Sequence, residues 1–341
     1  INLLFTTSPL YDPMVTAPGL AGSKVTHIEM FQDDPASDGM DWISRDHIYG
    51  KLRAFQPYYW WQVNVEDNDP IDAGAQRALR IFAGLLTEDD CWNAYGFPFA
   101  QLFCYFDANL DTYVPAYGPN DYVGEIFAFN TTDANLGAQY GLLGFSDDNW
   151  VDGTQSYVFE FGTDGYRSLG YGFSDTAVHE FGHHIGMSHP HDGYDSEFGI
   201  DYGPGGDLYF VWSGDESNTV MHYINLSDGF GQFDQDNMYR YETDGYLQWS
   251  AELYAKIQAD PDAKKVKGLV KLGLAKSAIA AKSFYQWNYL KAATNARLAY
   301  NAFAAAAEIL GIPLAPEKPV IPLVPNLEVP HEGDPIRFPD N

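Results

Sequence analysis

Apolar residues alternate with polar ones, or cluster with β-branched and aromatic residues, in several short segments of the first half of the chain. Both patterns are typical of β-strands. Elsewhere in this half the apolar positions recur every three or four residues, which predicts helices. The predicted strands are 24–32, 59–66, 101–106, 123–129 and 157–161, and the predicted helices are 42–55 and 72–86.

A further short helix is predicted over residues 174–186. Ser174 or Asp175 is the expected N-cap, because either side chain can accept a hydrogen bond from a free backbone N–H of the first turn. Gly186 stands where a left-handed residue commonly ends a helix. Loop-forming residues then dominate until about residue 234, where helical spacing returns and continues to about residue 257.

The last part of the chain is predicted to be mainly helical, with a long helix over 284–310 that Gly311 and Pro313 end. From Pro313 to Pro325 a proline recurs at every third residue, the period of polyproline II. This tail is a strap, a linker or a ligand for a partner domain. The residues that recur along one face of the long helix are Trp287, Leu290, Thr294, Leu298, Ala302, Ala305 and Ile309.

The charge of the chain is large and unevenly distributed. The formal net charge is −28, and residues 1–250 hold 8 Lys and Arg against 38 Asp and Glu, whereas residues 251–341 hold 11 against 9. Such an acidic protein repels nucleic acid and anionic membrane surfaces, so neither is an expected partner. The Lys-rich and Ala-rich segment 264–282 could lie on a membrane surface. We favour an arrangement in which this basic segment lies against the acidic remainder of the chain.

Several features are compatible with an extracellular protein. No apolar run approaches the roughly 20 residues that span a bilayer. The chain begins at Ile1 rather than Met, as expected if a leader or propeptide has been removed or if the sequence has been trimmed. Cys91 and Cys104 are the only cysteines. They form one disulfide or remain two buried thiols. The sequence does not decide between these alternatives, because a single pair has no diagnostic spacing.

The segment from His179 to His189 reads HEFGHHIGMSH and carries the clearest chemistry in the chain. On a helix, His179 and His183 are four residues apart and project from the same face, where two imidazoles can bind one zinc ion. Catalytic zinc takes three protein ligands and keeps a fourth position open. Gly186 allows a sharp turn, after which His189 can return as the third ligand. Glu180 can reach a zinc-bound water without ligating the metal.

His184 and His191 fit no ligand position in this pattern. His184 is expected on another face of the helix and His191 in a loop.

With this extended HExxHxxGxxH motif and the later segment Asn218-Thr-Val-Met-His-Tyr223, the chain resembles the metzincin clan of zinc metallopeptidases. The resemblance implies that Met221 forms a methionine turn, an apolar floor below the metal that does not ligate it. It also implies that Tyr223 approaches the zinc and helps to stabilise the tetrahedral intermediate, as in astacins and serralysins. Pro190 after the third His is more similar to serralysins, but no calcium-binding repeats follow, so the family within the clan stays open.

The resemblance and the patterns together predict the fold and its division into segments. The fold class is α/β (α+β), with a metzincin-like catalytic domain over 1–258 that contains a mixed twisted sheet and the active-site helix. Its upper part extends to about residue 189 and its lower part covers 190–258. A mainly helical C-terminal extension over 259–312 and the Pro-rich tail over 313–341 follow.

The predicted function is that of a secreted or cell-surface zinc endopeptidase, with Glu180 as the general base and a polypeptide as the substrate. The substrate is expected to pair with an edge strand, for which 123–129 and 157–161 are candidates. A propeptide or an inhibitor protein is a further expected partner. Two alternatives stay open, a catalytically silent surface or adhesion module with structural zinc and a zinc hydrolase of a non-protein amide. Asp147, Asp148 and Asp152 form either a Ca²⁺ site or a solvated acidic loop.

Overall fold

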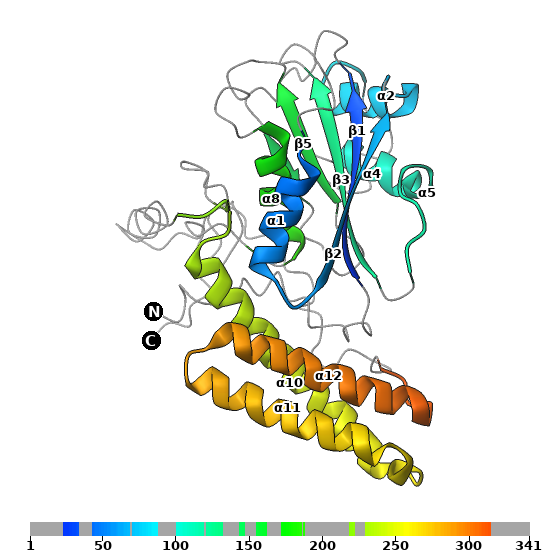
Figure 1. Ribbon diagram of the computed structural model, residues 1–341. Helices are drawn as coiled ribbons and strands as arrows, with labels where there is room; N and C mark the ends of the chain where they lie inside the picture. Colours follow the sequence, from blue (N-terminus) through cyan, green and yellow to red (C-terminus); the bar gives the residue numbers. More distant parts are fainter. Residues whose placement is uncertain are drawn as a thin grey trace, which may run out of the picture. The chain divides into compact units, whose positions relative to one another are not determined.

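The computed structural model describes residues 23–33, 43–68, 70–87, 100–118, 121–131, 143–146, 155–161, 172–185, 187, 218–221 and 229–314 (Figure 1). These residues fall into two compact units, one from Ser23 to His184 and the other from Ile185 onward. The predicted segment boundaries at 258 and 312 stay a prediction. No helix in the described ranges has the length and apolar content needed to cross a bilayer.

The first unit is built on a five-stranded sheet with the strand order β2-β1-β3-β5-β4. The first four strands are parallel, and the short strand β4 pairs antiparallel to β5 at one edge. The predicted strands 24–32, 59–66, 123–129 and 157–161 are therefore confirmed, and the mixed α/β class with them. The strands are β1 (Ser23–Gln32), β2 (Trp60–Asn68), β3 (Tyr122–Thr131), β4 (Gly144–Ser146) and β5 (Gln155–Phe161).

Helices cover both faces of this sheet (Figure 1). Helices α1 (Arg45–Phe55) and α8 (Gly172–His184) lie on one face, while α2 (Ala73–Phe82) and α4 (Ala100–Ala108) lie on the other. The two predicted helices of this region are confirmed over shorter ranges. Ser44 caps α1 and Asp72 caps α2, each by accepting a hydrogen bond from backbone N–H groups of the first turn.

The prediction of a strand over 101–106 is wrong, because these residues belong to helix α4. Their aromatic composition is typical of a strand, but Leu102, Phe103 and Phe106 are spaced so that one helical face buries all three. Phe106 stacks on Phe127 of β3 with ring centroids 4.0 Å apart. A short helix, α5 (Leu110–Tyr113), follows, and its Tyr113 completes the same aromatic core. Cys104 on α4 is disulfide-bonded, and the sequence contains one other cysteine, Cys91.

The described part of the second unit is mainly helical. Helix α10 (Gln232–Ala259) confirms the helical spacing predicted over about 234–257, and it packs with two further helices, α11 (Lys267–Tyr285) and α12 (Tyr289–Leu310). A 3-10 turn, η5 (Ala263–Val266), precedes α11. At Gly273 the ring of Phe303 lies so close that an added Cβ would approach it to 2.6 Å. The two helices therefore need a glycine at this crossing.

The single helix predicted over 284–310 is interrupted near its start. Helix α11 ends at Tyr285 and α12 begins at Tyr289, and between them Trp287 adopts a positive φ of 62°. The predicted end is confirmed, because Gly311 follows Leu310 with a φ of 70°.

The apolar face predicted for this helix is also largely wrong. Trp287, Leu290, Leu298 and Ile309 are exposed, and the buried side of α12 is made mainly of alanines with Tyr300 and Phe303. Small alanine side chains let the three helices approach closely, and the larger aliphatic residues remain on the surface.

Candidate metal centre

Helix α8 is fixed against the sheet by the aromatic side chain of Phe181. This ring lies edge-on to Trp61 of β2 with centroids 5.8 Å apart, and it is fully buried. It also lies directly over Gly124 of β3, where an added Cβ would collide with it. The absence of a side chain at Gly124 therefore sets how closely α8 can approach the sheet.

Both ends of α8 are tied to neighbouring elements by hydrogen bonds. The helix begins at Gly172, so Ser174 and Asp175 lie in its first turn and are not the N-cap that the sequence predicts. Their side chains bond to the start of α1 instead: Ser44 N–H donates to Ser174 Oγ at 2.8 Å, and His47 Nε2 lies 2.6 Å from Asp175 Oδ1. At the other end, Tyr122 Oη donates to the His184 carbonyl oxygen at 2.6 Å.

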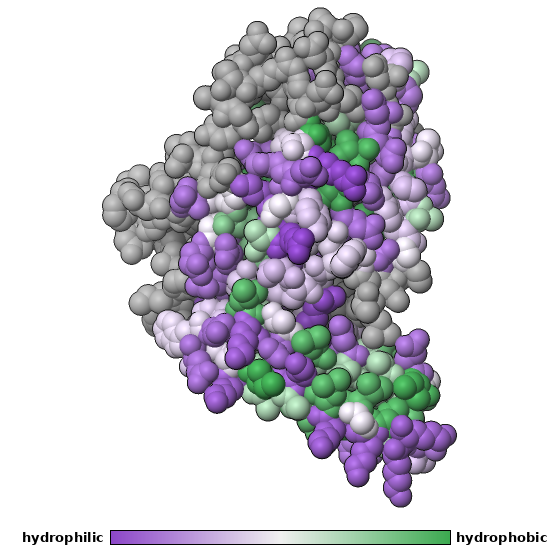
Figure 2. Space-filling view, in the orientation of Figure 1, coloured by the Kyte–Doolittle hydropathy of each residue, from purple (hydrophilic) through white to green (hydrophobic). Residues whose placement is uncertain are grey.

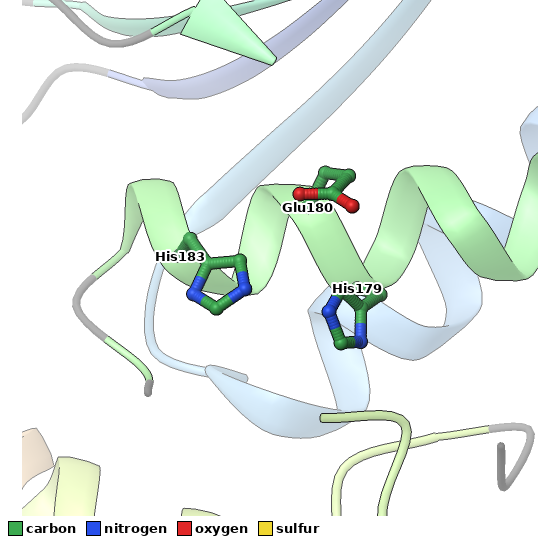
Figure 3. A group of neighbouring side chains, drawn as sticks. All are labelled: His179, Glu180 and His183. Atoms are coloured by element: carbon green, nitrogen blue, oxygen red, sulfur yellow. The ribbon is translucent and has the colours of Figure 1, made fainter. Parts of the chain in front are cut away.

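The side chains of His179, Glu180 and His183 gather on α8. Figure 3 shows both imidazoles on the lower side of the helix and the Glu180 carboxylate at its upper edge. One potential ligand atom from each of the three lies within 4.8 Å of those of the other two. The residues are 6%, 5% and 4% exposed, and the two imidazole centroids are 5.1 Å apart. Across the described ranges, no other group of three or more His, Cys, Asp or Glu side chains meets this criterion.

The edge strand β4 contributes a hydroxyl to this cluster. Ser146 Oγ lies 2.9 Å from Glu180 Oε2 and 2.9 Å from the Glu180 carbonyl oxygen, so its proton can be donated to either. The sequence did not indicate this contact, because β4 is a short segment in a region rich in Asp, Asn and Gly. Only the tertiary pairing of β4 with β5 brings Ser146 to the helix.

His184 lies on a different face of α8 from the two candidate ligands, as expected from the motif. It is 1% exposed and stacks on Phe181 with ring centroids 5.2 Å apart. Burial lowers the pKa of His184 to about 3, so the ring is neutral at physiological pH. A neutral imidazole packed between helix and sheet is a structural residue.

The segment around Met221 belongs to the second unit and is held by a buried hydrogen-bond network. Met221 is fully buried, and its N–H donates to Thr219 Oγ1 at 3.1 Å. The Thr219 hydroxyl in turn donates to Asp234 Oδ2, which also accepts the N–H of Gly231 at 2.8 Å. Asp234 lies in the first turn of α10, so the start of this helix fixes the backbone before Met221. Burial raises the pKa of Asp234 to about 6.

The remaining predicted residues lie outside the described ranges. They are the third candidate ligand His189, the glycine before it, Gly186, the residues Pro190 and His191, the candidate catalytic residue Tyr223, the acidic loop residues Asp147, Asp148 and Asp152, and the tail from residue 315.

Comparison with known proteins adds no relative. No protein-family model matches the chain, and no curated protein matches it. The case for a metal centre therefore depends on the motif and on the geometry of α8.

Proposed function

We propose that the chain is a zinc-dependent endopeptidase of the metzincin type. The observation that carries the proposal is the buried group of His179, Glu180 and His183, whose polar atoms lie within 4.8 Å of one another on one helix. Imidazole nitrogens and carboxylate oxygens are the atoms that zinc binds in proteins, and two imidazoles spaced four residues apart on a helix are a typical pair of ligands.

In this proposal His179 and His183 hold the zinc ion together with His189, the next histidine in the motif. Two nitrogens spaced four residues apart on α8 suit zinc, which binds neutral imidazole readily. A third ligand from the chain leaves one coordination position for water or substrate, as in catalytic rather than structural sites. When bound, zinc supplies a Lewis acid that polarises the scissile carbonyl and lowers the pKa of water toward neutrality.

Glu180 is the proposed general base. It adjoins a ligand in the sequence but lies beside the pair of imidazoles, so its carboxylate is available to accept a proton from the attacking water. It then delivers that proton to the leaving amine. The Ser146 hydroxyl lies 2.9 Å from Oε2 and restricts the rotation of the carboxylate when it donates to this oxygen. Tyr223 is proposed to stabilise the developing oxyanion, and Met221 to form the floor of the site.

The sheet suggests how a polypeptide substrate would lie. The two strands named as candidate edges are both interior: β3 lies between β1 and β5, and β5 lies between β3 and β4. The edge next to the cluster is β4, which also carries Ser146. An extended peptide that pairs with β4 would pass beside Glu180 and be held by backbone hydrogen bonds rather than by its side chains.

The location proposed for the enzyme is extracellular, either secreted or cell-surface. The disulfide at Cys104 supports this, because disulfides persist mainly in oxidising compartments.

Metal analysis of the purified chain tests the proposed ligands. The native protein is expected to retain one zinc after dialysis, and His179→Gln and His183→Gln are each expected to lose it. His47→Gln is the matched control, because this histidine lies on α1 outside the cluster and Gln can still donate to Asp175. Zinc retained by both ligand variants, or lost equally by the control, would contradict the assignment.

The same preparations distinguish the reaction classes. Hydrolysis of an unfolded protein indicates an endopeptidase. Hydrolysis of small amides alone would indicate a hydrolase of non-protein substrates. Stoichiometric zinc with neither activity would favour a structural module.

A further inference from the structure

The turn between α11 and α12 exposes two aromatic side chains almost completely. Tyr285 is 83% exposed and Trp287 is 81% exposed, the highest values among the large exposed hydrophobic residues of the described chain. Leu290, at the start of α12, is 41% exposed. Exposed aromatic groups of this size are unfavourable in water, so a surface that presents them is typically used for binding.

The backbone of this turn is well fixed, and it places Trp287 in an unfavourable conformation. Backbone hydrogen bonds close the turn, including Trp287 N–H to the Phe284 carbonyl at 2.9 Å and Asn288 N–H to the Ser283 carbonyl at 3.0 Å. The ring of Tyr289 packs edge-on to Phe284 with centroids 5.4 Å apart and lies below the guanidinium of Arg240.

Trp287 is the one non-glycine residue with positive φ in the described ranges. Glycine or asparagine would be more stable there, so folding does not account for a tryptophan.

The stretch of sequence that contains the turn is basic, in contrast to the rest of the chain. Residues 263–307 hold eight Lys and Arg and no Asp or Glu, in a sequence with 47 acidic residues. Lys282 and Lys291 flank the exposed aromatic groups, and both are exposed. Neither makes an ion pair with any other residue that the structure describes. Their charges are therefore available to a partner.

We propose that the tip of the α11–α12 hairpin, made of Lys282, Tyr285, Trp287, Leu290 and Lys291, docks onto an anionic lipid surface. Tyr and Trp favour the interface between water and hydrocarbon, because one end of each ring system is apolar and the other polar. Lysines beside them add attraction to anionic headgroups. Leu272, Leu274 and Ile279 are exposed along α11, as are Lys271 and Lys282. Figure 2 shows hydrophobic and hydrophilic side chains intermixed on the visible surface of the three-helix region.

An acidic protein partner would use the lysines but would not require exposed aromatic and aliphatic groups between them. The combination therefore favours a lipid surface. The acidic charge of the remaining chain does not prevent this, because salt screens charges beyond about 8 Å at physiological ionic strength. Docking in this way is peripheral and independent of any metal bound to α8.

Vesicle co-sedimentation of the full chain tests the proposal. The native protein is expected to bind phosphatidylcholine vesicles that contain phosphatidylserine, to bind pure phosphatidylcholine vesicles much more weakly, and to dissociate as salt is raised. Lys282→Gln with Lys291→Gln should weaken binding about twenty-fivefold, roughly fivefold for each lysine. Tyr285→Ser with Trp287→Asn should weaken it at least tenfold without loss of folding, because Asn tolerates the positive φ better than Trp.

A matched control lies at the opposite end of the same helices, about 30 Å away at 1.5 Å per residue. It combines Lys264→Gln with Ile309→Asn, which removes one exposed charge and one exposed apolar side chain that is 62% accessible. This variant is expected to bind vesicles like the native chain. Equal losses in the tip and control variants, or no vesicle binding by the native protein, would overturn the proposal. Capture on immobilised polyglutamate without vesicle binding would also overturn it and indicate an acidic protein partner.

Discussion

Replacement of Asp234 by Asn should change how the stability of the helical unit depends on pH. Asp234 is fully buried at the start of α10, and burial raises the pKa of its carboxyl from 3.8 to about 6. The folded protein therefore binds this proton more tightly than the unfolded chain. The stabilisation that results is complete below pH 4 and is lost as the pH rises through about 6.

The size of the effect follows from the pKa difference. The interval from 3.8 to about 6 corresponds to about 3 kcal/mol at about 1.4 kcal/mol per pH unit. Both hydrogen bonds to Asp234 end on Oδ2, from Thr219 and from Gly231, so an Asn can place its carbonyl oxygen there and keep them. Its amide group then replaces Oδ1, for which no hydrogen-bond partner is found. The variant keeps the network and loses the ionisation.

Urea unfolding followed by circular dichroism at several pH values measures this difference. The free energy of unfolding of Asp234→Asn minus that of the native chain should increase by about 1 kcal/mol between pH 5 and pH 6, and then level off above pH 7. Groups that titrate independently cancel in the subtraction. A difference that does not change between pH 5 and pH 7 would refute the argument that this buried carboxyl holds a proton.

Four other predictions concern the first unit and its site. Gly124→Ala should lower the free energy of unfolding by about 1–3 kcal/mol, because the Phe181 ring must move; thermal unfolding measures this, and an unchanged midpoint would contradict it. Burial raises the pKa of Glu125 to about 7, so the native chain should lose about 3 kcal/mol of unfolding free energy as the pH rises from 4.5 to 7. Glu125→Gln should not show this loss. Unfolding of both proteins at several pH values measures the difference, and the same pH dependence in both would contradict the prediction. Ser146→Ala should lower kcat about five- to tenfold at unchanged zinc content, because Glu180 loses one hydrogen bond; failure of Ser146→Thr to restore kcat would exclude a role for the hydroxyl. Removal of metal by a chelator should abolish hydrolysis and added zinc should restore it, whereas activity that persists without metal would refute a zinc mechanism.

The sequence predicted the features of the fold that depend on local pattern. Strands β1, β2, β3 and β5 follow from alternation and aromatic content, and the spacing of His179 and His183 places them on one face of α8. The prediction of a strand over 101–106 was wrong because it gave more weight to the aromatic composition than to the spacing of the apolar residues. Aromatic residues favour strands, but here they lie on one face of a helix and are buried against Phe127.

The features that the sequence missed depend on contacts between distant residues. Ser146 reaches Glu180, 34 positions away, only because β4 pairs with β5 at the sheet edge. Thr219 and Asp234 are 15 positions apart and meet through the turn before α10. The exposed side of α12 was misassigned because periodicity shows which residues share a face but not which face packs against the neighbouring helices. In α12 the face that packs is made mainly of alanines.

Hydrolysis of a fluorescently labelled unfolded protein by the native chain and by Glu180→Ala, measured side by side, tests the central claim most directly. The account predicts cleavage by the native chain and at least a hundredfold lower rate in the variant, roughly the loss expected when a general base is removed, with zinc content equal in both. Equal cleavage rates would contradict the role of Glu180. No cleavage by either protein, with zinc bound to both, would contradict the proposal that this site acts as an endopeptidase.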